Sequence, residues 1–452
     1  MTHLRIFKRL ISLATCLALG LADIASASGT DDRLIFVRDA EIEATIRAYA
    51  TPLFQVAGLE PDDIRVFLVQ KDQINAFVAG GLNLFLYTGL LIRSESANQV
   101  IGVIAHETGH IAGGHLARMK DELDKALFES LAAIVLGIGA AVASGQAGAA
   151  AVVIGAGTGI AQRNLLQYSR TQEASADSAG VGFLDATGQS ASGLVQFLEI
   201  LRTQEFMLSG RQDPYVQSHP LTTERLNFLR QHVRESPYSN VPDTPDNAEA
   251  HRRMKAKLIG FLQPLGSVLR QYPAGDDSLA ARYARAVAYY RAPDLAKAVP
   301  LIDGLIKERP EDPYFAELKG QMMFENGRLA EALPCYRRAV ELQPKSALLR
   351  LELAQVEIEM NDRALDRDAL AQLEEVTRIE TRNAEAWRLL SIAYGREGKM
   401  ADSALALAEA ASARGEKKEA RLQADRAQQK FPYGSPGYRR AQDILDADKS
   451  TD

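Results

Sequence analysis

The C-terminal part of this 452-residue sequence is built from a repeated unit. Small, aromatic and apolar residues and a closing proline return with a spacing of about 34 residues. The first copy has Ala286, Tyr289, Ala298 and Pro310, and the second has Gly320, Met323, Ala332 and Pro344. A unit of this length folds as a helical hairpin that cannot bury its apolar face alone. Neighbouring hairpins must therefore stack into a solenoid with a concave binding surface.

This period is that of the tetratricopeptide repeat. Further small and aromatic residues fall at the expected positions of the second unit and of a later one: Gly327, Tyr336, Ala339, Trp387, Leu390, Tyr394 and Gly398. About four units fit between Ser278 and Tyr438 if the third is lengthened around residues 362–368. We therefore predict an α-helical repeat domain over 278–445, with an unrelated helical bundle as the alternative.

The first 27 residues have the composition of a secretory signal peptide. Arg5, Lys8 and Arg9 precede an apolar run over 10–22, and small residues end the segment at Ala27. This pattern predicts secretion and cleavage after Ala27. Cys16 resembles a lipoprotein cleavage site only weakly, because the apolar segment before it is too short.

The mature chain is acidic and keeps one thiol. Loss of residues 1–27 removes three basic residues and one acidic residue, which lowers the formal charge from −6 to −8. A chain of this charge binds nucleic acid poorly, so we expect no nucleic-acid partner. Cys335 remains alone, so no internal disulfide can form.

Residues 28–235 show the mixed pattern of an α+β domain. Apolar residues predict a helix over 40–54 and strands over 64–69 and 82–87. Residues 79–81 suit a turn, and residues 94–96 introduce a helix over 97–120. Three prolines then mark residues 236–277 as a linker with a bridging helix that begins near Asn247.

Residues 131–161 contain no charged side chain and are rich in Ala, Gly, Val and Ile. A polar break over 144–146 leaves two halves, each roughly 20 Å long as a helix, which is shorter than the ~30 Å core of a bilayer. A single crossing would also separate residues that we predict to bind one metal. We therefore expect a helical hairpin that is either buried or also meets lipid or a membrane protein.

The helix predicted over 97–120 contains the sequence His-Glu-Thr-Gly-His at 106–110. Four residues of helix turn by about 400°, so His106 and His110 project from one face and can direct ring nitrogens at one Zn²⁺. Glu107 borders that face, where it can take a proton from a water on the metal. This HExxH pattern predicts a zinc hydrolase, although the same spacing also occurs on ordinary helix surfaces.

A catalytic zinc needs a third protein ligand and an open position. His115 is one candidate, but the HExxHxxGxxH pattern requires a histidine at the position of Leu116, so we take His115 as structural. Glu173 is the second candidate, and Asp177 lies one helical turn later, where it can orient a ligand histidine. A solvated acidic helix face is the alternative for these two carboxylates.

The HExxH motif, the ExxxD motif over 173–177 and His219-Pro220 followed by Arg225 resemble the gluzincin metalloproteases that include HtpX and the CAAX prenyl proteases. The signal peptide and the repeats are similar to the periplasmic branch of that family. The resemblance covers nearly the whole mature chain. It implies a mainly α protein, with an α+β zincin-like metalloprotease domain that has a small β-sheet, followed by an α-helical tetratricopeptide-repeat solenoid.

The resemblance also implies roles for individual residues. One Zn²⁺ per chain is expected on His106, His110 and Glu173. The expected catalytic residues are Glu107, His219 and Arg225, with Asp177 in support. Two roles stay open for His219, which either stabilises the oxyanion or binds zinc as a fourth ligand and holds the enzyme latent.

The strand over 82–87 resembles the strand at the edge of the family's substrate cleft. Asn83, Phe85 and Tyr87 are therefore expected to bind an extended substrate through backbone pairing. An ordinary hairpin strand is the alternative.

The implied function is zinc-dependent peptide-bond hydrolysis in periplasmic protein quality control. The expected partners are unfolded outer-membrane β-barrel proteins and their assembly machinery, bound through the repeat domain, with peripheral membrane contact. The enzyme would degrade misfolded or stalled clients and assist their assembly. The alternative is a tetratricopeptide-repeat chaperone or scaffold with a latent or structural zinc site, but structural sites more often use Cys ligands, and none lies nearby.

Overall fold

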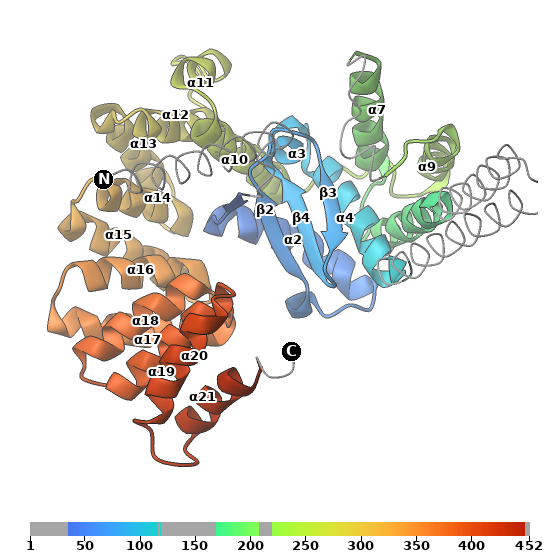
Figure 1. The fold of residues 1–452 in the computed structure, drawn as a ribbon. Helices are drawn as coiled ribbons and strands as arrows, with labels where there is room; N and C mark the ends of the chain where they lie inside the picture. The colour runs from blue at the N-terminus through green and yellow to red at the C-terminus, as the bar shows by residue number, and fades with distance from the viewer. Residues whose placement is uncertain (1–34, 116–117, 119–168, 208–218, 448–452) are drawn as a thin grey trace, which may run out of the picture.

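The computed structural model describes residues 35–115, 118, 169–207 and 219–447 (Figure 1). A small mixed sheet with helices packed on it is followed by a long array of helices, so the predicted fold class is confirmed. The predicted signal peptide over 1–27 and the apolar hairpin over 131–161 lie outside the described residues. Within the described part of the chain, every helix falls short of the length and apolar character that a membrane span requires.

Four short strands form the sheet: β1 (Phe36–Val37), β2 (Arg65–Val69), β3 (Ala76–Ala79) and β4 (Asn83–Tyr87). Their order is β1-β2-β4-β3, in which β4 is parallel to β2 and antiparallel to β3. Gly80 and Gly81 form the turn between β3 and β4 with φ angles of 58° and 94°, a region that glycine enters without steric cost. The predicted strands over 64–69 and 82–87 and the turn at 79–81 are confirmed.

The expectation that residues 82–87 form an edge strand is wrong. β4 pairs on both sides, with β2 through residues 65–69 and with β3 through residues 76–79. The backbone of β4 makes its hydrogen bonds inside the sheet, so Asn83, Phe85 and Tyr87 cannot bind a substrate by strand pairing. The strand at that edge of the sheet is β3.

Helices cover one face of the sheet. α2 (Ala40–Val56) is capped by the side chain of Asp39, and α4 (Ala97–Ala112) is capped by the side chain of Ser96. Apolar residues of the sheet, of α2 and α4, of the helical residues 169–186, and of α7 (Ser192–Met207) and α9 (Thr223–Glu235) share one core. α4 ends before Gly114, whose φ is 62°, so it is shorter than the helix predicted over 97–120. The short elements η1 (Pro61–Asp63) and α3 (Thr88–Arg93) flank β2 and β4.

The helix α10 (Pro245–Leu262) joins the two parts of the molecule. It begins close to Asn247, as predicted, and packs against both α2 and α12 (Leu279–Arg291). The fully buried ammonium group of Lys257 lies 2.8 Å from Asp39 and 3.3 Å from Glu317. A buried charge without partners is costly, so this cluster favours one placement of the repeats beside α2.

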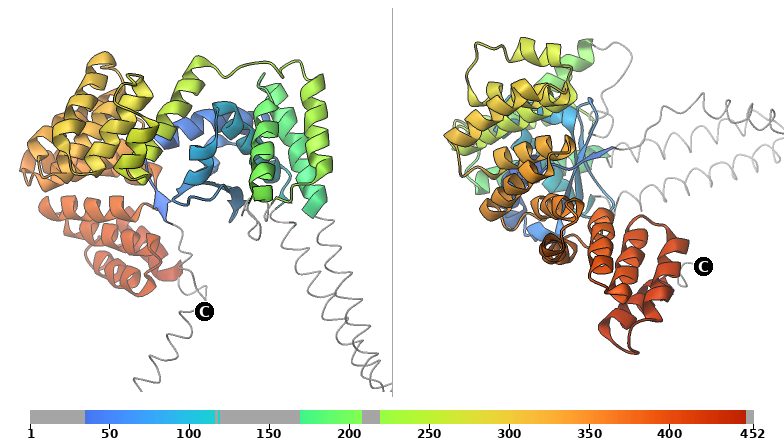
Figure 2. Two further views of the ribbon diagram at one scale, coloured as in Figure 1. Left: turned by 90° about the horizontal axis from the view of Figure 1, so that it is seen from above. Right: turned by 90° about the vertical axis from the view of Figure 1, so that its left-hand side faces the viewer.

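The repeat region consists of stacked helical pairs (Figure 2). After α11 (Leu265–Gln271) and α12, its helices are α13 (Leu295–Glu308), α14 (Pro313–Glu325), α15 (Leu329–Leu342), α16 (Ala347–Glu359), α17 (Arg363–Ile379), α18 (Ala384–Arg396), α19 (Met400–Ala413), α20 (Lys417–Gln428) and α21 (Pro436–Ala447). A Cβ on Gly320 would lie 3.0 Å from the ring of Tyr336, so this predicted small–aromatic pair packs within one hairpin. α17 is the lengthened helix of the third unit. About four units were expected between Ser278 and Tyr438, whereas the described residues form a fifth pair, α20 and α21, of which α20 lies within that range.

Candidate metal centre

The HExxH helix α4 and the helix over 169–186 approach each other closely at two glycines. A Cβ on Gly109 would lie 2.6 Å from the carbonyl oxygen of Ala176, and one on Gly180 would lie 3.1 Å from the backbone nitrogen of His106. A larger residue at Gly109 would push the helices apart, because packed interiors leave no spare volume. This close approach brings Glu173 up to the histidines of α4.

Four buried side chains converge at this helix crossing: His106, His110, Glu173 and His219, with potential ligand atoms that all lie within 4.8 Å of one another. The Nε2 atoms of His106 and His110 are 3.2 Å apart. The carboxylate oxygens of Glu173 lie 3.4 Å and 3.3 Å from these two nitrogens. Nδ1 of His219 lies 3.4 Å from Nε2 of His106 and 3.1 Å from Glu173.

These spacings fit a tetrahedral metal ion. Bonds of about 2.0–2.1 Å place the ligand atoms of a tetrahedral zinc site about 3.4 Å apart. Imidazole nitrogens and a carboxylate are also the donors that zinc accepts in hydrolases. The structure thus brings together the three predicted ligands and adds His219 as a fourth donor.

The protonation states of His110 and Glu173 suit a cation. Burial lowers the pKa of His110 to about 4, so its imidazole is neutral and keeps a free lone pair. Burial opposes the charged form of Glu173, but hydrogen bonds with His106, His110 and His219 outweigh it and lower the pKa of this carboxyl group. Metal binding needs neutral imidazole and an ionised carboxylate, a condition that His110 and Glu173 already meet. Burial lowers the pKa of His106 less than hydrogen bonds with Asp177 and Glu173 raise it, to about 10, so His106 must release a proton when a metal ion binds.

Asp177 and Arg225 hold the donors from behind. Asp177 lies 2.9 Å from Nδ1 of His106, which leaves Nε2 of that ring directed at the other donors. Arg225, in the first turn of α9, donates hydrogen bonds of 2.6 Å and 2.8 Å to Asp177, and its Nη1 lies 2.8 Å from Glu173. Burial alone would raise the pKa of Asp177, but hydrogen bonds with Arg225 and His106 outweigh this effect and lower the pKa to about 2. The carboxylate therefore stays charged.

Glu107 is buried beside His106, His110, Glu173 and His219, which together form the donor group. Burial raises the pKa of Glu107, although electrostatic interactions with His219 and His106 oppose that effect. Neither carboxylate oxygen accepts a hydrogen bond from the described residues, while Nε2 of His219 lies 3.3 Å from Oε1. A carboxylate with a raised pKa is suited to accept a proton during a reaction.

His115 belongs to the surroundings of the donors in a way that its sequence position did not predict. After the turn at Gly113 and Gly114, its Nδ1 lies 3.0 Å from Nδ1 of His110. Gln172 in turn donates a 3.2 Å hydrogen bond to the carbonyl of His115. His115 therefore steadies His110 from its outer nitrogen, and the signal that could have indicated this is the left-handed glycine placed between the two histidines.

The strand residues predicted to bind substrate are not part of the donor group. Asn83 donates hydrogen bonds to the carbonyls of Ala79 and Gly80 and so closes the turn before β4. Phe85 stacks between Phe67 and Phe77, and Tyr87 is buried. Asn83 therefore supports the fold rather than a substrate.

Comparison with known proteins gives family matches to both parts of the chain. Residues 37–233 match Peptidase family M48. Residues 265–313, 283–347 and 319–364 match the Tetratricopeptide repeat. The first match contains every predicted ligand and catalytic residue.

Several relatives bear names that describe proteases. The chain is 25% identical to the putative beta-barrel assembly-enhancing protease of Vibrio cholerae serotype O1, over 76% of this chain and 70% of the relative. It is 27% identical to the beta-barrel assembly-enhancing protease of Escherichia coli (strain K12), over 64% of this chain and 59% of the relative. It is also 29% identical to metalloprotease LoiP of the same strain, over 46% of this chain and 78% of that protein.

Proposed function

We propose, from the premise that residues 37–233 are a Peptidase family M48 domain ahead of tetratricopeptide repeats, that this metalloprotease is a zinc-dependent endopeptidase acting on unfolded proteins of the bacterial envelope. One observation carries the proposal. His106, His110, Glu173 and His219 present four donors at tetrahedral spacings beside the buried carboxylate of Glu107. A structural zinc site has no use for such a carboxylate, whereas a hydrolase needs one.

In the proposed mechanism, His106, His110 and Glu173 hold the zinc ion. When bound, zinc supplies a Lewis acid that polarises a peptide carbonyl and makes water easier to ionise. Glu107 accepts the proton of the attacking water and returns it to the leaving amine. Each of these proton transfers uses the same carboxylate, whose pKa burial has raised.

Asp177 and Arg225 act through the ligands in this proposal. Asp177 fixes the ring of His106, and Arg225 holds both Asp177 and Glu173 through its guanidinium group. Partners of this kind orient metal ligands and raise their affinity for the ion. Arg225 is therefore a positioning residue rather than a catalytic one.

For His219 the contacts favour the latent role. Its Nδ1 stands among the donors, at the position that a catalytic zinc keeps open for water or substrate. A histidine bound there would exclude both. We propose that the resting enzyme keeps His219 in this position, and that His219 must leave it before hydrolysis.

The proposed location and clients rest on other observations. The basic and apolar pattern of residues 1–27 supports export to the periplasm. The names of the relatives support outer-membrane β-barrel proteins as clients, in a misfolded or stalled state, and the repeats support binding to them and to their assembly machinery. We also propose the division into a peptidase domain over 28–235, a linker and bridging helix over 236–277 and a repeat domain over 278–445, which agrees with the end of α9 and the start of α10.

Hydrolysis of casein by the native protein and by Glu107→Gln tests the peptidase proposal, with the zinc content of both proteins measured in parallel. We expect both to bind zinc and the variant to hydrolyse at least ~100-fold more slowly, because it lacks the general base. Equal hydrolysis by the two proteins would refute the mechanism. Zinc binding without hydrolysis by the native protein and by His219→Ala would favour the scaffold alternative.

A further inference from the structure

Four phenylalanine side chains form a continuous row across the sheet. Phe67, Phe85 and Phe77 stand opposite one another in register on β2, β4 and β3. Their rings stack with centroids 5.0 Å and 4.9 Å apart, and Phe36 of β1 lies 5.6 Å from Phe67. The alternate residues of these strands belong to the core with α2 and α4, so the row lies on the other face of the sheet.

This row is only partly covered by protein. Phe36 is 49% exposed, and the other three phenylalanines are half-buried. The guanidinium group of Arg65 lies 5.6 Å above the ring of Phe67. A contiguous apolar surface of this kind usually meets a partner. The row reaches from β1 to β3, the strand that packs against the HExxH helix α4.

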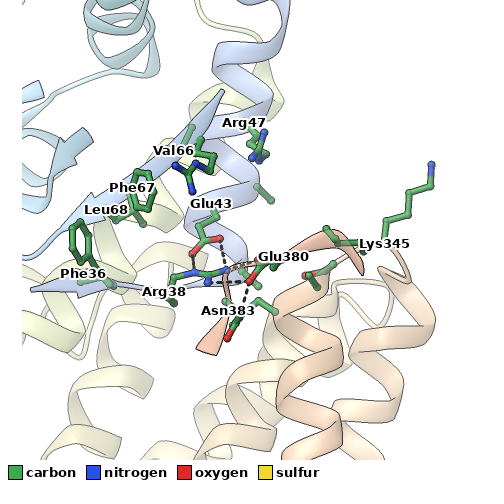
Figure 3. A pocket seen from close by; sticks show the side chains of 18 of the residues that line it. Phe36, Arg38, Glu43, Arg47, Val66, Phe67, Leu68, Lys345, Glu380 and Asn383 are labelled. Atoms are coloured by element: carbon green, nitrogen blue, oxygen red, sulfur yellow. Dashed lines mark hydrogen bonds and ion pairs between the residues drawn. The ribbon is translucent and has the colours of Figure 1, made fainter. Parts of the chain in front are cut away.

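At its β1 end the row opens into a cleft of about 950 Å³ between the sheet and the repeats (Figure 3). One wall is made by β1, β2 and α2, and the other by the loops before α16 and α18. Arg38 connects the walls, since its guanidinium group lies 2.7 Å from Glu43 of α2 and 2.7 Å from Glu380 of the repeats. Ile379, which is 47% exposed, adds an apolar side chain from the repeat side.

The charged side chains that line this cleft are mostly basic. They are Arg38, Arg47, Arg65, Lys345 and Arg382, against Glu43, Asp62 and Glu380. Arg38 is paired with Glu43 and Glu380. The other four basic side chains are exposed, and the only other acidic side chain in this lining is Asp62. The cleft is therefore basic, although the formal net charge of the whole chain is −6. A basic rim around an aromatic floor is complementary to a ligand with acidic and aromatic side chains.

We propose that this cleft binds an extended segment of unfolded polypeptide that carries aromatic side chains next to acidic residues. Its aromatic side chains stack on Phe36 and Phe67, and its carboxylates meet Lys345, Arg382 and Arg47. The inference rests on the proposed function in taking an unfolded protein as the client. It adds a binding site at the β1 edge of the sheet, between α2 and the repeats, which holds the client while another part of it reaches the metal centre.

Peptide binding to the full chain tests this inference. The probe is a short fluorescein-labelled peptide in which Phe and Tyr alternate with Asp and Glu, followed by fluorescence anisotropy with Glu107→Gln so that it is not cleaved. We expect about tenfold weaker binding when Lys replaces the acidic residues, or Ala the aromatic ones. Equal binding of the three peptides would overturn the proposed ligand chemistry.

Variants of the cleft locate the binding. We expect Phe36→Ser with Ile379→Ser, and separately Lys345→Glu with Arg382→Glu, each to weaken binding about tenfold. Tyr433→Ser, at an aromatic residue that is 90% exposed, and Lys430→Glu are the matched controls outside the cleft lining. Both controls should bind as Glu107→Gln does. Native-like binding by both cleft variants would overturn the proposed site.

Hydrolysis of a short unlabelled peptide by proteins that keep Glu107 separates the two proposals. If neither the native protein nor His219→Ala shows hydrolysis, the proposed function fails whatever the anisotropy shows. If hydrolysis is intact and the cleft variants bind the probe normally, the function stands and the cleft proposal fails. We expect the cleft variants to keep the native kcat for the short peptide and to lose efficiency only on unfolded proteins.

Discussion

Gly109 lies against the backbone of Ala176, so closely that a Cβ on Gly109 would come within 2.6 Å of the carbonyl oxygen of Ala176. Ala176 stands between Glu173 and Asp177 on the same helix. The separation of the two helices therefore sets how far Glu173 reaches toward His106 and His110. Because Gly109 has no side chain, it allows the close helix contact on which the donor group depends.

Gly109→Ala should separate these helices and weaken metal binding. The added methyl group must displace backbone, so we expect a loss of about 1–3 kcal/mol of unfolding free energy together with lower zinc affinity. Gly182→Ala is the matched control, because a Cβ at Gly182 meets no atom within 4 Å. That control should be neutral or slightly stabilising, as alanine favours helix. Thermal unfolding and zinc titration measure both effects, and a Gly109→Ala protein with native zinc affinity would contradict the packing argument.

Removal of His219 should activate the enzyme. His219→Ala leaves the three proposed zinc ligands in place and empties the fourth position, so we expect unchanged zinc content and a several-fold rise in kcat/KM for a peptide substrate. His232→Ala is the control, since His232 pairs with Asp185 outside the donor group. A fall in kcat/KM for His219→Ala would instead indicate that His219 stabilises the oxyanion.

The local sequence pattern predicted β2, β4, the helices α2, α4 and α10 and the helical repeats, because apolar spacing and cap residues act over a few residues. It did not predict β1, which has only two residues. It also did not predict that β4 lies inside the sheet, because the order of strands depends on pairings between distant segments. β3 has only four residues, too few to indicate that it forms the edge. The ion pair between Arg38 and Glu380 could not be predicted from the sequence either, since nothing in the local sequence of either residue indicates the other.

The contacts of His115 show a further limit. His115 was separated from the metal ligands because position 116 does not continue the extended motif. His115 is not among the four donors, as the motif predicts. The motif cannot, however, predict the 3.0 Å contact between the Nδ1 atoms of His115 and His110. The contact depends on how the chain turns at Gly114, and a spacing rule holds only while the helix continues.

Stability should depend on pH through Glu357 in the repeats. Burial, with the charge of Asp368 added, raises the pKa of Glu357 from 4.5 to about 7, against the opposing effect of Arg337. The folded state therefore favours the protonated carboxyl, and this contribution is present below pH 4.5 and lost as the pH rises through about 7.

We expect Glu357→Gln to remove that dependence. Between about pH 5 and pH 8 the native protein should lose up to about 3 kcal/mol more unfolding free energy than Glu357→Gln. Glu359→Gln, at an exposed position on the same helix, should behave as the native protein does. Urea unfolding at the two pH values measures this, and parallel pH profiles for native and Glu357→Gln would contradict the role of burial.

The zinc content of the purified protein and of Glu173→Ala, measured by mass spectrometry, tests the central claim most directly. We predict one zinc ion per native chain and a large loss of zinc from Glu173→Ala, since the variant lacks the only carboxylate of the donor group. A native protein without stoichiometric zinc, or a Glu173→Ala protein that retains it fully, would contradict the account.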